Sequence, residues 1–226
     1  MQLNWLLRYQ PVVRLLEQRP PGTILDVGSG WHGLSAYVSG EIIQTDLAFA
    51  SPTQPVAGFS PVLVAASADA LPFTDGAVDC CVSLDMVEHL PDSIRISSVR
   101  ELCRVSRGAV IIGFPVGSAA RRVDSVLDRL LGVLRRPSPD WLMEHLGQER
   151  YPTVDVVVDG LPPGWRISRV VGSGNVVLLA SAVLAEELPG TRRVCARLER
   201  RWRRRGVPRL FDGGSTYRRI YLLEAI

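Results

Sequence analysis

The sequence predicts an α/β protein with a doubly wound, mostly parallel sheet. Short apolar segments alternate with helical patterns through the first half, at the spacing expected of strands joined by crossover helices. The first of these segments runs into a glycine-rich turn, Gly28-Ser29-Gly30, with G-x-G-x-x-G spacing. A length of 226 residues and an apolar content of 46% suit one such domain with a substantial core. The expected strands of the first half lie at residues 23–27, 41–46, 61–66, 77–84 and 109–114.

Helices and loops are expected between these strands. Residues 3–18 carry apolar side chains at helical spacing, interrupted by Pro11, and predict one or two short helices. Residues 32–38 are expected to start the first crossover helix, and residues 51–60 to form a loop. The amphipathic pattern at 92–106 predicts a helix before the fifth strand.

The second half is less regular. Five prolines between residues 137 and 164 favour a short helix, a turn and an extended piece. The remaining expected elements are a helix at 119–134, a strand at 164–171, an apolar helix at 175–188, an arginine-rich helix at 191–205 and a last strand at 216–225.

Charge is concentrated in one segment of the chain. The formal net charge is +3, but residues 192–205 contain eight arginines against Glu199, a charge of +7, so the remainder carries 3 − 7 = −4. Three interpretations of residues 175–205 stay open: a packed helix with a solvated charged partner, a surface that docks on anionic membrane lipid, and an RNA-binding element. Trp202 is the only stacking side chain there, so RNA ranks last and nucleic acid is not expected as a partner.

Composition also indicates the cellular compartment of the protein and whether it binds a metal. The four cysteines form no C-x-x-C pair and no cluster with histidine, which favours buried thiols in a reducing compartment and predicts no metal site. Residues 1–19 lack the features of a secretion signal, and no apolar run is long enough to span a bilayer. A cytoplasmic protein is therefore expected, with contact at the inner membrane face only if residues 175–205 dock there.

Acidic residues follow several of the expected strands at their carboxyl ends. Asp46, Asp69 and Asp85 come at or just after the second, third and fourth strands, at the edge where open α/β sheets bind ligands. Asp26 precedes the first glycine by two residues, where a carboxylate repels a pyrophosphate but attracts a ligand with ammonium and sulfonium groups. A nucleotide-dependent dehydrogenase shares the glycines but accounts for neither Asp26 nor Asp69.

Together these motifs resemble the class I S-adenosylmethionine-dependent methyltransferases, in particular the type 11 methyltransferase domain. The resemblance covers residues 24–115 and rests on Ile24–Gly33, Thr45-Asp46-Leu47, Asp69–Phe73, Val82–Leu90 and Arg100–Val105. It implies a seven-stranded Rossmann-like sheet with an antiparallel last strand. The implied organisation is one methyltransferase domain over residues 1–226, with a helical cap at 1–22, a cofactor-binding half at 23–115, and a substrate half at 116–226 that includes the helical insert 175–205.

The resemblance also implies roles for individual residues. Gly28, Ser29 and Gly30 would pass close to the methionine part of S-adenosyl-L-methionine, with Asp26 near its amino group. Asp46, followed by Leu47, would hold the ribose. Asp69 and Ala70 would contact the adenine, and Leu84 and Asp85 would line the crevice below the sulfonium.

Three residues are candidates for catalysis. His89 follows the fourth strand on the crevice side and can titrate near neutrality, so it is the first candidate for a general base. His145, beside Glu144, is the second, and Asp85 is the third. A structural, hydrogen-bonded histidine is the alternative for both imidazoles.

The sequence therefore predicts methyl transfer from S-adenosyl-L-methionine to an oxygen, nitrogen or carbon atom of a small-molecule or lipid-linked substrate. Two alternatives stay open: a catalytically silent, cofactor-binding regulatory protein, and an RNA-binding methyltransferase-like protein that uses the arginine-rich helix. The acceptor itself cannot be identified from residues 115–165.

Overall fold

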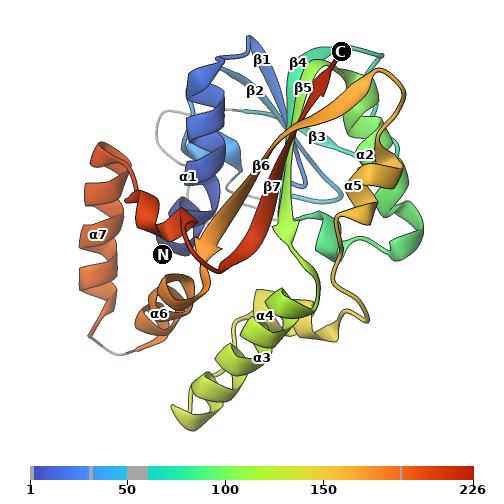
Figure 1. Ribbon diagram of the computed structural model, residues 1–226. Helices are drawn as coiled ribbons and strands as arrows, with labels where there is room; N and C mark the ends of the chain where they lie inside the picture. The colour runs from blue at the N-terminus through green and yellow to red at the C-terminus, as the bar shows by residue number, and fades with distance from the viewer. Residues whose placement is uncertain (1–2, 31–32, 50–60, 189) are drawn as a thin grey trace.

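A computed structural model describes residues 3–30, 33–49, 61–188 and 190–226. His32 and the loop predicted at residues 51–60 lie outside the described residues. Figure 1 shows a twisted central sheet with helices on both faces, and a helical pair, α3 and α4, that extends away from the carboxyl-terminal end of β5.

Seven strands form one sheet in the order β3-β2-β1-β4-β5-β7-β6. The first five strands are mutually parallel, and β7 inserts antiparallel between β5 and β6. The predicted doubly wound, seven-stranded, Rossmann-like sheet with an antiparallel last strand is confirmed. The strands are β1 (Thr23–Val27), β2 (Glu41–Asp46), β3 (Val62–Ala65), β4 (Val78–Leu84), β5 (Ser106–Pro115), β6 (Trp165–Asn175) and β7 (Thr216–Ala225).

The helices divide between the two faces of the sheet and its carboxyl-terminal edge. α1 covers one face and α2 and α5 cover the other, while α6 and α7 lie beside α1 (Figure 1). The α-helices are α1 (Leu3–Gln18), α2 (Asp92–Val105), α3 (Gly117–Val133), α4 (Asp140–Gly147), α5 (Asp155–Gly160), α6 (Val176–Glu187) and α7 (Arg192–Arg205). Short 3₁₀ helices are η1 (Leu34–Ala36), η2 (Val87–His89) and η3 (Arg209–Asp212).

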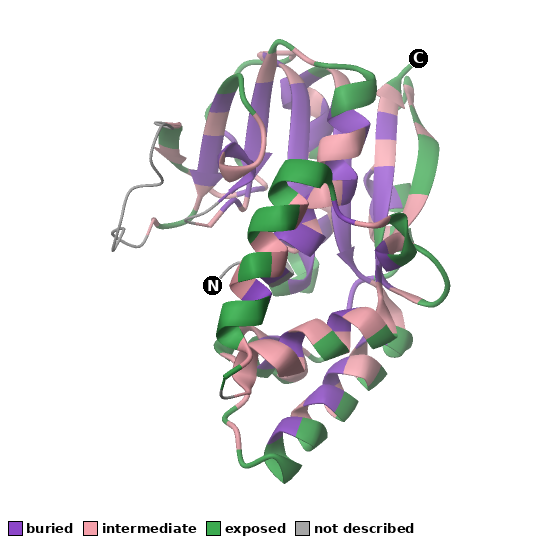
Figure 2. Ribbon diagram, turned by 90° about the vertical axis from the view of Figure 1, so that its left-hand side faces the viewer, coloured by how far each residue is buried: buried purple, intermediate pink, exposed green. Residues whose placement is uncertain are grey.

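Each face of the sheet has its own apolar core because β1, β4 and β5 are covered on both sides. Figure 2 shows buried residues concentrated in these central strands, with exposed residues on the outer sides of the helices. β4 has almost no exposed position, as its continuous apolar sequence predicts. No helix in the described part of the chain has the length and apolar character needed to cross a membrane.

Three local expectations change. The first crossover helix predicted from residue 32 is wrong: β2 starts at Glu41, so the connection after Gly33 has room for only the single 3₁₀ turn η1. Residues 3–18 form one helix, with Pro11 inside it. The proline-rich segment 137–164 contains two short helices, α4 and α5, where one was predicted.

The arginine-rich helix α7 is packed rather than detached. Its apolar side, with Cys195 fully buried and Leu198 and Trp202 partly buried, joins an apolar cluster with α1 residues such as Leu6. Most of its arginines are exposed. This arrangement agrees with a packed helix that has a solvated charged face; docking on anionic lipid and RNA binding stay predictions.

Candidate functional site

The glycine-rich turn after β1 is held by its backbone. The amides of Gly28 and Ser29 both donate to the carbonyl of Thr45 at the end of β2. Gly28 has a φ of +71°, and a Cβ there would lie 2.4 Å from Cγ of Met86, so this position requires glycine. Gly30 has a φ of +57° with open space where a Cβ would lie.

Asp26 lies beneath this turn. Its Oδ2 accepts a hydrogen bond from the amide of Leu34 at 2.6 Å, while Oδ1 is buried without a hydrogen-bond partner among the described residues. Burial raises the pKa of Asp26 to about 7, against the opposing effect of the Leu34 amide and of Arg8. The carboxylate therefore has one oxygen available to a buried cation.

Asp46 ties the turn to β2. Its Oδ2 accepts from the amide of Gly30 and its Oδ1 from the amide of Leu47, both at 2.8 Å. The side chain of Leu47 is 71% exposed at the edge of the sheet. Asp69 accepts from the hydroxyl of Ser67 in the loop after β3 and is partly exposed.

A cavity of about 240 Å³ lies at the carboxyl ends of β1, β2, β3 and β4. Five of the predicted site residues line it: Gly28, Asp46, Leu47, Asp85 and His89. Its other walls, which the sequence analysis did not assign, come from residues after β3 and β4: Ala66, Ser67, Ala68, Met86, Leu90 and Ile94, with Val27. We call this space the first cavity.

Two of the predicted cofactor residues point into the protein instead. Leu84 is 1% exposed and packs in the core against Ile220, so its side chain does not line the crevice. Because β4 is covered on both faces, a side chain on either face of this strand is buried. Ser29 is also buried, and its hydroxyl donates to the carbonyl of Gly30. Asp26, Gly30, Asp69 and Ala70 are near the turn or the β3 loop but are not among the cavity walls.

A second, smaller cavity of about 90 Å³ adjoins the first. Asp85 and His89 line both cavities, so the two spaces meet at these residues. The remaining walls come from four different elements: Trp5 and Arg8 of α1, Trp141 and His145 of α4, Leu179 of α6, and Tyr217 and Arg218 of β7. The predicted substrate half thus contributes most of this second cavity.

Asp85 is held by two arginines. Arg218 makes a bidentate contact, with Nε to Oδ1 at 2.8 Å and Nη2 to Oδ2 at 2.6 Å, and Nε of Arg8 lies 3.2 Å from Oδ2. Burial alone would raise the pKa of Asp85, but the guanidinium groups of Arg218 and Arg8 hold it below its ordinary value. With its oxygens engaged and a left-handed φ of +49°, Asp85 is suited to positioning rather than to proton transfer.

The two candidate histidines lie together. Their ring centroids are 5.1 Å apart, and Nδ1 of His89 is 3.5 Å from Glu144. Burial, with the neighbouring His145, lowers the pKa of His89 to about 4, so its imidazole is neutral at pH 7. His145 is buried, and its Nδ1 contacts Asp124 at 3.2 Å and the Tyr217 hydroxyl at 3.1 Å.

Glu88, which the sequence analysis did not single out, lies between these groups. It is 1% exposed, and its Oε1 is 3.7 Å from Nε2 of His145. Burial, together with the carboxylate of Asp85, raises the pKa of Glu88 well above its ordinary value. The Glu88-His89 pair is adjacent in the sequence, but its partner His145 is distant in the chain.

A larger cavity, of about 610 Å³, lies at the opposite edge of the sheet. Its walls include Cys80 and Ala109 at the amino-terminal ends of β4 and β5. Open α/β sheets bind their ligands at the carboxyl ends of the strands, so we place the functional site at the two smaller cavities.

Part of the chain is similar in sequence to known methyltransferases. Residues 25–112 match the family model of a methyltransferase domain. A protein of Mycobacterium sp. (strain KMS) named as an uncharacterized methyltransferase is 36% identical over 111 residues, which cover 44% of this chain and 42% of that protein. A homologue from strain JLS is 34% identical over 107 residues. The chain thus spans about two fifths of the length of these curated relatives.

Solved methyltransferases share the fold. Magnesium protoporphyrin IX methyltransferase of Synechocystis, solved with bound S-adenosylhomocysteine, superposes with a TM-score of 0.55 at 15% identity and covers 99% of this chain and 84% of its own. The 1,6-didemethyltoxoflavin-N1-methyltransferase of Burkholderia thailandensis gives a TM-score of 0.53 at 13% identity over 97% of this chain and 77% of its own. Such identities establish a common fold, and over residues 25–112 the sequence is similar to a methyltransferase domain.

Proposed function

We propose that this protein transfers a methyl group from S-adenosyl-L-methionine to an oxygen, nitrogen or carbon atom of a small-molecule or lipid-linked acceptor. The observation that supports this most directly is the junction of the two cavities at Asp85 and His89. A cofactor in the first cavity and an acceptor in the second would meet at these residues. Positioning two reactants in this way can supply about 7–11 kcal/mol of a reaction barrier.

The residues present fit the cofactor. The buried Oδ1 of Asp26 lacks a partner, and an ammonium group that reached it beneath the turn would supply one. Asp46 and Leu47 line the first cavity where a ribose would lie, and Gly28 leaves no side chain in its path. We assign Asp69 and Ala70 to the adenine from their place in the β3 loop. S-adenosyl-L-methionine would supply a methyl carbon already activated by its sulfonium.

His89 is our candidate for removing a proton from an acceptor that needs it. It lines both cavities and its imidazole is neutral at pH 7. Asp85 would hold Arg8 and Arg218 in the wall of the second cavity, and Asp124 would orient His145. These are positioning roles.

The second cavity favours a planar acceptor with a hydrogen-bond-accepting atom. Three of its walls are aromatic: Trp5, Trp141 and Tyr217. Arg218 also lines it, and Nη1 of this arginine is buried without a hydrogen-bond partner among the described residues. An oxygen of the acceptor would satisfy this donor.

Calorimetric titration with S-adenosylmethionine and S-adenosylhomocysteine tests the cofactor. We expect stoichiometric binding of both, weakened at least tenfold by Asp46→Ala and unchanged by Asp75→Asn, a change in an exposed carboxylate that pairs with Arg104 away from the site. Absence of binding to either compound would overturn the proposal.

Labelled cofactor incubated with separate lipid, small-molecule and RNA fractions of a lysate tests the acceptor. We expect label to enter the small-molecule or lipid fraction. Label in RNA would favour the RNA-binding alternative, and cofactor binding without transfer to any fraction would favour the catalytically silent one; each result contradicts the proposed activity.

A further inference from the structure

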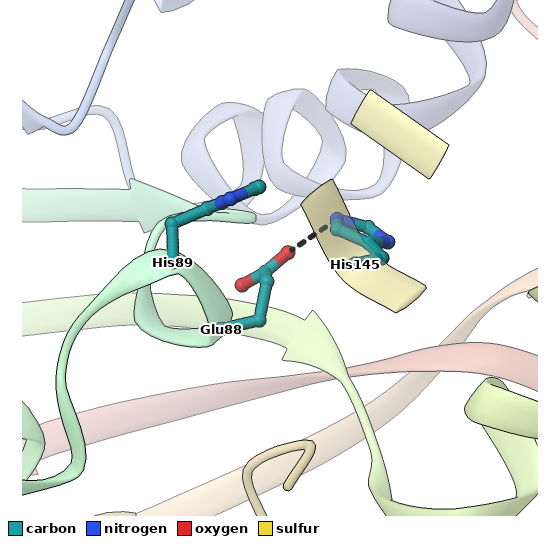
Figure 3. A group of neighbouring side chains, drawn as sticks. All are labelled: Glu88, His89 and His145. Carbon is teal, nitrogen blue, oxygen red and sulfur yellow. Dashed lines mark ion pairs between the residues drawn. The ribbon is translucent and has the colours of Figure 1, made fainter. Parts of the chain in front are cut away.

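We propose that Glu88, His89 and His145 bind a divalent transition-metal cation such as Zn²⁺ between η2 and α4. One donor atom from each residue lies within 4.8 Å of the others. Figure 3 shows Glu88 and His89 on the same turn, with the Glu88 carboxylate directed toward the imidazole of His145 on the facing helix. Tetrahedral ligands with bonds of about 2.0–2.2 Å to zinc lie about 3.3–3.6 Å apart, so donor atoms up to 4.8 Å apart must approach one another by roughly 1.2–1.5 Å.

The Glu88 carboxylate supplies independent support. The residue is 1% exposed, and neither of its oxygens accepts a hydrogen bond from another described residue. A buried carboxylate without such partners carries a large desolvation cost. A cation held by this carboxylate would offset that cost.

His145 is oriented as a metal-binding histidine would be. Its Nδ1 faces the carboxylate of Asp124, which also accepts from the hydroxyls of Tyr151 and Tyr217. Because an ionised carboxylate can only accept, Nδ1 carries the proton and Nε2 keeps its lone pair on the side of Glu88. A carboxylate that fixes the tautomer of a histidine in this way is a usual partner of metal ligands.

The donor set and charge favour a transition metal. Two imidazole nitrogens with one carboxylate suit Zn²⁺ or Mn²⁺, whereas Mg²⁺ and Ca²⁺ prefer oxygen ligands alone. The carboxyl groups at the cluster are Asp85, Glu88, Asp124 and Glu144, and the guanidinium groups are those of Arg8 and Arg218. Four negative charges against two positive ones leave −2 when Glu88 is ionised, which a divalent cation would neutralise.

The position of the cluster beside the second cavity would allow a bound cation to contact the acceptor. Three protein ligands leave a fourth position of a tetrahedral cation open, and His89 and His145 both line the second cavity. An oxygen or nitrogen atom of the acceptor could take that position, and the cation, which would occupy the lone pair of His89, would then replace His89 in promoting loss of the acceptor's proton. This consequence rests on the proposed function, whereas binding of the cation does not. The sequence predicted no metal site because Glu88 and His89 are separated from His145 by more than fifty residues along the chain.

Calorimetric titration of the chelator-treated, full chain with ZnCl₂, without any methyl donor, tests the site. We expect one Zn²⁺ per chain and at least a tenfold weaker affinity for His89→Asn and Glu88→Gln. His89 is partly exposed, so its variant is expected to fold; Glu149→Gln, a change in an exposed carboxylate, is the matched control and should bind as the original chain does.

Co²⁺ in place of Zn²⁺ provides a second readout. Visible absorption of Co²⁺ bound to nitrogen and oxygen ligands should appear in the original chain and in Glu149→Gln, and be lost in His89→Asn. Absence of stoichiometric binding, or binding that both site variants leave unchanged, would overturn the metal site. Because no methyl donor is present, either result is independent of the proposed methyl transfer.

Discussion

At the scale of single residues, the carboxylate of Asp26 combines a structural cost with a proposed role in binding. Its folded-state pKa of about 7 lies above the ordinary value of 3.8. The folded protein therefore holds a proton at this residue that the unfolded chain releases, and the unfolding free energy falls as the pH rises from about 4 to about 7. Above about pH 7 the unfolding free energy no longer changes with pH through this residue.

We expect Asp26→Asn to stabilise the cofactor-free protein above pH 7, by on the order of 2 kcal/mol, because it removes this buried charge. The same change should weaken binding of S-adenosylmethionine roughly 10- to 100-fold, since a charged hydrogen bond to an ammonium group contributes about 1.5–3 kcal/mol. Urea denaturation across pH and calorimetry measure the two effects. A variant that binds the cofactor normally would show that Asp26 has only a structural role.

Gly28 and Gly30 form a matched pair, since both have positive φ but only Gly28 has a close neighbour. We expect Gly28→Ala to lower the unfolding free energy by about 2–4 kcal/mol, from strain and from the contact of the new Cβ with Met86. Gly30→Ala should cost only about 1 kcal/mol because its Cβ would enter open space. Equal losses in chemical denaturation would contradict the packing at Gly28.

At the scale of elements, α1 is built into the site rather than placed over it. Arg8 donates to the carbonyl of Leu84 at the end of β4, and Trp5 and Arg8 line the second cavity. Tyr9, fully buried on the same helix, stacks on Tyr37, and its hydroxyl has no hydrogen-bond partner among the described residues. The ring therefore stabilises the fold by packing, whereas burial of the unpaired hydroxyl lowers the unfolding free energy.

We expect Tyr9→Phe to leave the unfolding free energy unchanged or to raise it by up to about 2 kcal/mol, because it removes a buried hydroxyl that makes no hydrogen bond. Tyr217→Phe is the matched control: its hydroxyl donates to the buried Asp124, so this variant should lose about 1–3 kcal/mol. Destabilisation of Tyr9→Phe by as much as its control would mean that the Tyr9 hydroxyl is satisfied in the folded protein.

Strands and long helices could be predicted because their patterns are local. The continuous apolar run of β4 and the amphipathic spacing of α2 identified both elements within a residue or two. The first crossover helix was predicted wrongly although the second strand was correctly expected from residue 41, because the helical pattern was given more weight than the short connection that follows Gly33. The face of β4 on which the Leu84 side chain lies could not be predicted either, because hydrophobic periodicity does not distinguish the two faces of a strand that is covered on both.

At the scale of the whole molecule, Asp85 joins parts of the chain that are far apart. Arg8 on α1 and Arg218 on β7 both reach this carboxylate at the end of β4. The edge of the sheet that we propose for the cofactor could be predicted because Gly28, Asp46 and Asp85 each lie at the carboxyl end of a different strand. The second cavity and the Glu88 cluster could not, because they depend on α1, α4 and β7 meeting in space.

We expect Asp85→Asn to lower the unfolding free energy by about 3–5 kcal/mol, since it leaves two buried guanidinium groups without their counter-charge. Asp69→Asn lies at the same edge of the sheet, where the side chain of Asp69 accepts a hydrogen bond from Ser67 alone among the described residues, and it should change the unfolding free energy by less than about 1 kcal/mol. Chemical denaturation of both variants distinguishes an ion cluster that supports the fold from a dispensable surface contact.

The Arg8–Asp85–Arg218 contact also has a consequence for synthesis. During translation, Arg8 and Asp85 leave the ribosome long before Arg218 does, so until then Asp85 lacks one of the two guanidinium groups that surround it in the finished fold. The first five strands can pair while β7 is still absent, but the wall between the two cavities cannot close. A partly synthesised chain could thus form its glycine-rich turn before the proposed acceptor cavity is complete, so the proposed methyl transfer could begin only after β7 has inserted.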